Sequence, residues 1–343
     1  QEISNILWAF AKKNQKATKL FDSMVPKIIS NIDEFHPQAM ANIVWSYAKI
    51  GHQSPELFEA ISKMAINKLN TFDSQNIANM VWAYATLDHE SPDLFEAVSV
   101  TTVNKLHTFN SQAMTNTLFA YGKLGHQAPG LLEAISQRAI NELDTFTPQA
   151  ISNTVIAYAK LDHQSPELFE AISQTAVCNL DKFEPQVIAN MVWAYAKIGQ
   201  LAPNLFEAIP KIAINKLGRF DSQNMSNTVW AYAKLGHQAP DLFEAVSVNA
   251  IDKLETFSSQ EISMTIWSYA ILEHKSPDLF EAISQRAMDK LDAFTPQAMA
   301  NIVLAYAKLG YQTPDLFEAI SQKAIRKLDT FTPQAMANTV WAY

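Results

Sequence analysis

The chain has 343 residues, 48% of them hydrophobic, and a formal net charge of −8 at pH 7. Its one cysteine, Cys178, excludes an internal disulfide framework and a cysteine-rich metal site. No apolar run approaches the roughly 18 residues of a membrane-spanning helix, and an acidic balance is unusual for a nucleic-acid-binding protein. We therefore expect a large buried core with neither disulfides nor membrane insertion.

A 37-residue repeat runs from one end of the chain to the other. A period in this range is typical of stacked helical repeats. We predict an all-α fold, an α-solenoid (superhelix) of tandem helix-turn-helix repeats in a single array over residues 1–343. Both ends fall inside a repeat, so we expect a fragment of a longer protein. The glutamines that open nine complete repeats and a partial tenth are Gln1, Gln38, Gln75, Gln112, Gln149, Gln186, Gln223, Gln260, Gln297 and Gln334.

Each repeat opens with a predicted helix of about thirteen residues, numbered here from its glutamine as position 1. The residues just before it, such as Asp73 and Ser74, are typical of a helix N-cap and first turn. Glycine at position 14, as in Gly51, supplies the left-handed residue that ends a helix. Asp88, Asp162 and Glu273 replace this glycine in three repeats, where the same conformation is less favourable.

A second helix is predicted from position 18 to about position 33. Ser54, Pro55 and Glu56 are typical of a helix N-terminus. The serine hydroxyl is a candidate N-cap, proline suits the first turn, and the carboxylate is favoured near the positive end of the helix dipole. Apolar residues at positions 20, 21, 24, 28 and 32 keep helical spacing and predict a buried stripe. A phenylalanine at position 35, such as Phe72, closes each repeat.

A helical wheel of the first helix predicts which positions face the core. Positions 3, 4, 7, 8, 10 and 11, including the tryptophan at position 8, fall on one side, and positions 2, 5, 6, 9 and 12 fall on the other. Position 5 is asparagine in nine of ten repeats, with Met264 as the exception. Two explanations stay open for this row: a hydrogen-bond ladder between repeats, or contacts with a ligand.

Positions 2 and 6 vary on either side of the constant asparagine. Variation beside a fixed frame favours a protein that reads one RNA base with each repeat, and unconstrained surface drift is the alternative. Position 12 is lysine in seven of nine repeats. Positions 1–13 carry a net charge of +6 and the remainder carries −14. The lysine row fits a track for RNA phosphates, although lysines at a helix C-terminus also complement the helix dipole.

The segments FDSQNIANMVWAYATL and FTPQAMANIVLAYAKLG resemble the octotricopeptide repeat family, and the 37-residue period is closest to its heptatricopeptide members. The resemblance implies helical-hairpin solenoids that bind single-stranded RNA in chloroplasts or mitochondria and act in RNA processing, stability or translation. It also implies that positions 2, 5 and 6 face the RNA, at about one nucleotide per repeat. The organellar location rests on this resemblance alone.

The predicted site is therefore a set of residues on the first helices. The base-facing residues are Asn42, Asn76, Asn79, Met80, Asn116, Thr117, Asn153, Thr154, Asn190, Met191, Asn224, Asn227, Thr228, Glu261, Thr265, Asn301 and Ile302. The phosphate-binding residues are Lys49, Lys123, Lys160, Lys197, Lys234 and Lys308. We expect no cofactor, no bound metal and no DNA partner.

No catalytic motif is present, so we expect no enzymatic activity within this stretch, and a catalytic domain outside it is left open. The alternative function is a protein–protein interaction scaffold, or a subunit of an organellar RNA or ribosomal assembly, that uses the same surface.

Overall fold

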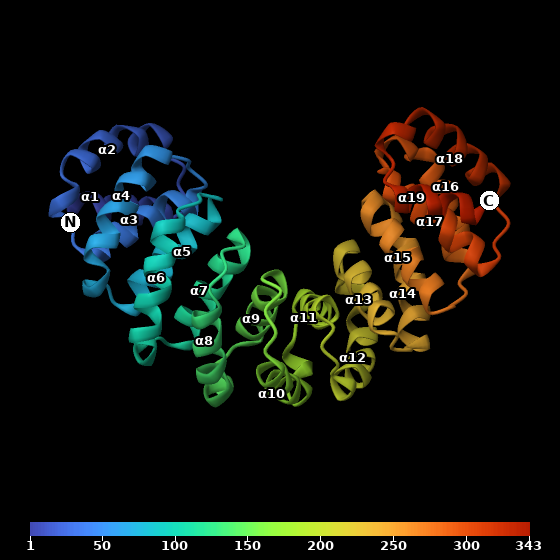
Figure 1. Cartoon of the computed structure of the whole chain (residues 1–343), viewed down its shortest axis with the longest axis horizontal. Helices are drawn as coiled ribbons and strands as arrows, with labels where there is room; N and C mark the ends of the chain where they lie inside the picture. The colour runs from blue at the N-terminus through green and yellow to red at the C-terminus, as the bar shows by residue number, and fades with distance from the viewer. The chain divides into compact units, whose positions relative to one another are not determined.

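The structure is a computed structural model that describes residues 1–343 as nineteen α-helices and nine short 3₁₀-helices, without strands. This confirms the predicted all-α solenoid class. The chain divides into two compact units, Gln1–Ile172 and Ser173–Tyr343, and each is described by itself. Within each unit, consecutive helix pairs follow one another in chain order (Figure 1). None of the helices has the length and apolar character required to cross a membrane.

The odd-numbered helices are the first helices of the repeats. They are α1 (Glu2–Lys12), α3 (Pro37–Ile50), α5 (Ser74–Thr86), α7 (Ser111–Leu124), α9 (Pro148–Lys160), α11 (Pro185–Ile198), α13 (Ser222–Leu235), α15 (Ser259–Ile271), α17 (Pro296–Leu309) and α19 (Pro333–Ala342).

The even-numbered helices are the second helices. They are α2 (Thr18–Ser30), α4 (Pro55–Lys68), α6 (Pro92–Lys105), α8 (Pro129–Glu142), α10 (Pro166–Val177), α12 (Pro203–Lys216), α14 (Pro240–Asp252), α16 (Pro277–Asp289) and α18 (Pro314–Arg326). One 3₁₀ turn follows each of them: η1 (Ile32–Glu34), η2 (Leu69–Thr71), η3 (Leu106–Thr108), η4 (Leu143–Thr145), η5 (Leu180–Lys182), η6 (Leu217–Arg219), η7 (Leu254–Thr256), η8 (Leu291–Ala293) and η9 (Leu328–Thr330).

The ends of the first helices form as the sequence predicts. The Asp73 carboxylate accepts a hydrogen bond from the Asn76 backbone N–H at 2.7 Å, which satisfies one of the unpaired donors of the first turn. Gly51 ends α3 in the left-handed conformation with φ 68°. Asp88 takes the same conformation with φ 52°, as expected for a residue that replaces glycine at this position.

The second helices open differently from the prediction. Proline does occupy their first position, but the serine hydroxyls do not cap them: Ser54 and Ser91 make no side-chain cap hydrogen bond. The backbone gives the reason. Ser54 has ψ 79°, whereas Asp73 has ψ 170°, in the extended range where a cap side chain meets the first-turn N–H groups.

First helices of neighbouring repeats pack closely along their lengths, as α3 does on α5 and α5 on α7, while the second helices meet over shorter stretches. Small residues permit the close approach. Ala78, Ala83 and Ala85 of α5 are fully buried. A Cβ added at Gly122 would lie only 2.8 Å from the Cα of Ala157. The first helices therefore form the dense layer of each unit.

A buried tyrosine at position 10 ties each repeat to the one before it. The Tyr84 hydroxyl donates to the backbone carbonyl of Phe58 at 2.7 Å, and the Tyr121 hydroxyl donates to that of Phe95 at 2.6 Å. Burial raises the pKa of both tyrosines well above the ordinary value, so each hydroxyl keeps its proton. The same bond is made by Tyr47, Tyr158, Tyr232, Tyr269 and Tyr306.

A lysine at position 31 makes a second connection between repeats. The Lys105 ammonium donates to the carbonyls of Asn70 at 2.6 Å and Phe72 at 2.9 Å, at the end of the preceding repeat. These carbonyls would otherwise lack a partner at the 3₁₀ turn. Lys68, Lys216 and Lys253 make equivalent pairs of bonds. Neither connection is visible from periodicity alone.

We expect Tyr121→Phe to lower the free energy of unfolding by about 1 kcal/mol, because it removes a buried hydrogen bond while keeping the ring. Thr102→Val is the matched control in the same unit, since the buried Thr102 hydroxyl has no hydrogen-bond partner and its loss should be neutral or stabilising. Urea unfolding followed by circular dichroism measures both. Equal losses of stability in the two variants would contradict the assigned role of the tyrosine.

Candidate functional site

Between the terminal helices α1 and α19, the open side of a first helix is a narrow row at positions 1, 5, 8 and 12. These spacings of four, three and four residues place the side chains in one line along the helix. In α13 the row is Gln223, Asn227, Trp230 and Lys234, of which the glutamine and lysine are exposed and the other two are half-buried. We call this row the Gln-Asn-Trp-Lys stripe. It is the part of the first helices that a ligand can reach.

The predicted exposure of position 6 is wrong. Met191 and Thr228 have no exposed surface, and the Thr117 hydroxyl is turned back onto the carbonyl of Ala113 at 2.9 Å. The position 6 residues of the predicted site that are buried in this way are Met80, Thr117, Thr154, Met191, Thr228, Thr265 and Ile302. The cause is packing: a first helix is covered on both flanks by neighbouring first helices, so its open arc is much narrower than half the wheel.

Position 2 is also covered, so its predicted exposure is wrong as well. Asn76 is 8% exposed and Asn224 is 7% exposed. Glu261 is half-buried, and its carboxylate accepts from the Ser258 backbone N–H at 2.7 Å in a capping box. These three side chains belong to helix starts and the helix–helix boundary rather than to the open surface.

The asparagine row at position 5 does lie at the open surface, half-buried. Its hydrogen bonds run within one helix: the Gln149 amide donates to Asn153 at 2.8 Å, and the Gln297 amide donates to Asn301 at 2.9 Å. The predicted alternative, a ladder between repeats, is not formed. Six of the amides make no hydrogen bond to another protein group and are free for a ligand: Asn5, Asn42, Asn79, Asn116, Asn190 and Asn227.

The tryptophans at position 8 are part of the stripe, although the sequence analysis assigned them to the core. Trp8 and Trp341, in the first and last helices, are 38% and 65% exposed, and the other five are half-buried. The rings of Trp45 and Trp82 lie 6.4 Å apart between centroids and are tilted by 33°. The Lys12 ammonium lies 4.7 Å from the centre of the Trp8 ring, a cation–π contact. The spacing of positions 5, 8 and 12 was the signal that could have identified this row.

The lysines at position 12 form the end of the stripe. Lys49, Lys160, Lys197, Lys234 and Lys308 are exposed and make no ion pair within the chain. Lys123 differs, because its ammonium lies 3.1 Å from the Asp88 carboxylate and 3.1 Å from the Thr86 carbonyl of the preceding repeat. The predicted lysine row is therefore at the surface, with one member neutralised by a partner.

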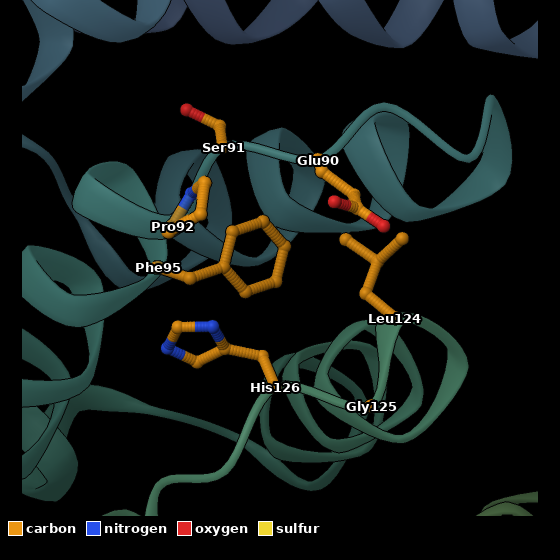
Figure 2. Close-up of a pocket in the computed structure, with 7 residues that line it drawn as sticks. All are labelled: Glu90, Ser91, Pro92, Phe95, Leu124, Gly125 and His126. Atoms are coloured by element: carbon orange, nitrogen blue, oxygen red, sulfur yellow. The ribbon is translucent and has the colours of Figure 1, made fainter.

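A small cavity of about 160 Å³ lies at the junction of the third and fourth repeats (Figure 2). The His126 ring faces Phe95, with centroids 5.6 Å apart, and lies 5.6 Å from the Tyr121 ring. At the equivalent position, burial lowers the pKa of His89. The ring packing gives these histidines a structural role in the turn between the two helices.

Sequence comparison places the chain in a family. The family model described as RESC6, RNA-editing substrate-binding complex 6 protein, matches residues 1–240 and, a second time, residues 220–343. The chain belongs to this family. The match supports the predicted membership of a helical repeat family. No curated protein matches the chain significantly.

Two solved structures that are similar to the chain share 12% sequence identity with it. One is a homology model of the full-length AP-3 complex in an intermediate open conformation, with 12% identity and a TM-score of 0.37, covering 95% of this chain and 69% of that chain. Another is the pentatricopeptide repeat protein PPR10 from maize, with 12% identity and a TM-score of 0.28, covering 99% of this chain and 66% of that chain.

The corrected faces of α11 lead to a prediction for two adjacent residues. Met191→Asn should lower the free energy of unfolding by about 3 kcal/mol, because it removes buried apolar volume and buries an amide without partners. Asn190→Ala should change it by no more than about 0.5 kcal/mol, since that side chain lies at the surface. Urea unfolding measures both, and the reverse order of effects would show that the faces are assigned wrongly.

Proposed function

We propose that the protein binds single-stranded RNA along the Gln-Asn-Trp-Lys stripe, at about one nucleotide per repeat, and acts without catalysis by this chain. One observation carries the proposal: a row of partly exposed tryptophans lies beside amides that have no protein partner and lysines that have no acidic partner. Aromatic rings, free amides and ammonium groups are the three chemistries by which proteins hold unpaired bases and their phosphates.

The geometry of one tryptophan pair, Trp45 and Trp82, is close to that needed for a base between neighbouring rings. A base stacked between two aromatic planes needs about 3.5 Å on each side, or roughly 7 Å in all. Trp45 and Trp82 are 6.4 Å apart, so a small opening of the pair would admit one base. Asn42 and Asn79 lie one helical turn away on the same stripe, where an amide can hydrogen-bond to a base edge.

The charge distribution supports binding of an anion on this side of the protein. The first helices carry the free lysines of position 12, whereas the rest of the chain is strongly acidic. Single-stranded nucleic acid would therefore be attracted to the stripe and repelled elsewhere. This reconciles an RNA partner with the overall charge of −8.

The family name and the repeat resemblance support the biological setting of the proposal. The matching family is described as an RNA-editing substrate-binding complex protein. On that basis we propose that this chain binds an RNA substrate. We retain the narrower assignment to octotricopeptide or heptatricopeptide repeats as part of the proposal. With it comes an organellar location, mitochondrion or chloroplast, and a role in RNA processing, stability or translation.

A protein–protein scaffold, or a subunit of an organellar assembly, is the second candidate function. The acidic surface outside the first helices favours it, because that surface repels RNA and suits basic protein partners. The sequence predicts a scaffold that uses the first-helix surface; we propose instead that it uses the acidic surface, so that the two functions are compatible.

We expect single-stranded RNA to quench the intrinsic tryptophan fluorescence of the protein. All seven tryptophans occupy position 8, so this signal comes from the stripe alone. Trp230→Ala should weaken binding of an oligouridine probe roughly 5- to 100-fold, the range expected for the loss of one base–aromatic stack. Leu304→Ala, at position 8 of α17, is the matched control and should change affinity less than about twofold. Full binding without quenching would contradict base stacking.

The lysine row has a separate test in the salt dependence of RNA binding. The double variant Lys197→Ala/Lys234→Ala should reduce the slope of log affinity against log salt by roughly 0.7 for each lost phosphate contact. Lys211→Ala, an exposed lysine of the second helix α12, is the control and should leave the slope unchanged. Equal slopes for all three proteins would show that position 12 does not contact phosphates.

A further inference from the structure

The second helices carry one apolar groove that the RNA proposal does not use. It lies between α6 and the start of α8 and has a volume of about 340 Å³. Val100 and Val103 of α6 line it and are 56% and 41% exposed. Pro129, Gly130 and Leu131 of α8 line the other side. Valine side chains that are this exposed on the surface of a helix lower the solubility of a protein unless another molecule covers them.

Two substitutions in the repeat create this groove. Position 26 is polar in most repeats: Lys63, Gln137, Gln174, Lys211, Gln285 and Gln322. It is valine only in Val100 and Val248. Position 19 is Glu, Asp or Asn wherever proline opens the second helix, except at Gly130, where a Cβ would meet nothing within 4 Å. Only the α6–α8 junction combines the valine with the glycine.

Gly130, in the first turn of α8, is a poorer helix former than the residues that stand at this position in the other repeats. It also removes the acidic side chain that elsewhere favours the helix N-terminus, so α8 has no acid in its first turn. The helix therefore gives up stability twice at this position. The gain is an open approach to Val100 and Val103.

The surroundings of the groove are negatively charged. Glu96 lines it, and Asp93 and Glu133 are exposed on the same two helices. The basic residues of this region are occupied: Lys105 binds two backbone carbonyls, and Arg138 lies 2.9 Å from the Glu142 carboxylate. The charged side chains around the groove that form no ion pair are therefore acidic, and they favour a basic partner.

We propose that the α6–α8 groove docks an amphipathic helix of a partner protein. Apolar side chains of that helix pack on Val100, Val103 and Pro129, and its lysines or arginines face Glu96, Asp93 and Glu133. Helix-in-groove recognition of this kind combines an apolar face with flanking charge. The groove lies on the second helices, so this interaction is independent of the RNA-binding stripe.

The test uses two synthetic helical peptides as probes, one made of leucine and lysine and one made of leucine and glutamate. The leucine–lysine peptide should bind the intact protein, and the double variant Val100→Gln/Val103→Gln should bind it at least tenfold more weakly. Glutamine already stands at position 26 in Gln137 and Val103 is 41% exposed, so the variant is expected to fold, which circular dichroism checks. Val248→Gln is the matched control, since it removes an equally exposed valine where Asp278 replaces the glycine.

Support requires weaker binding by the double variant, unchanged binding by Val248→Gln, and slowed hydrogen exchange in α6 and the first turn of α8 on peptide binding. Equal affinity of the double variant and the intact protein would overturn the proposal, since charge alone would then explain binding. Equal affinity for the leucine–glutamate peptide would overturn it too. Oligouridine should not displace the leucine–lysine peptide, and displacement would show that the peptide occupies the stripe instead.

Discussion

The hydrogen bond from a buried tyrosine to the carbonyl of the preceding repeat is the interaction on which the rest of each unit depends. It fixes the first helix of one repeat against the second helix of the previous one, as Tyr84 does on Phe58. Because the donor is fully buried and its partner is a backbone atom, the bond tolerates little displacement. Repeated at a constant interval, it holds the first helices in register, and register is what turns separate side chains into a continuous stripe.

Much of the fold follows from the sequence, because its signals are local. A cap such as Asp73 and a left-handed residue such as Gly51 act within one turn of helix, and the structure has both. The open face could not be located in the same way. A wheel treats a helix as covered on one side, whereas α13 is covered on both flanks by α11 and α15, which buries Thr228 and leaves Asn227 at the surface. Whether a neighbour covers a flank is a property of the stack, not of any single repeat.

The candidate site shows the same division. The asparagine row was predictable because asparagine is a mediocre helix former, so its repetition within a helix needs a reason. The lysine row was predictable because it recurs in a chain that is acidic overall. The tryptophans were misassigned because large aromatic side chains are usually buried and nothing in one repeat says otherwise. Trp230 is in fact half-buried: one part of the ring supports the packing of the helix and the other meets solvent. A side chain that both packs in the helix layer and meets solvent cannot be assigned to the core or to the surface from its residue type alone.

The lysines of this protein fall into two chemically identical but structurally distinct groups. Lys105 and its equivalents hold backbone carbonyls across a repeat junction, while Lys197 and its equivalents extend from the stripe without a partner. Acetylation removes the charge and hydrogen-bonding capacity of a lysine. On the first group it would loosen the junctions between repeats, and on the second it would change only the surface potential. One modification would therefore report on folding or on binding, depending on which lysine carries it.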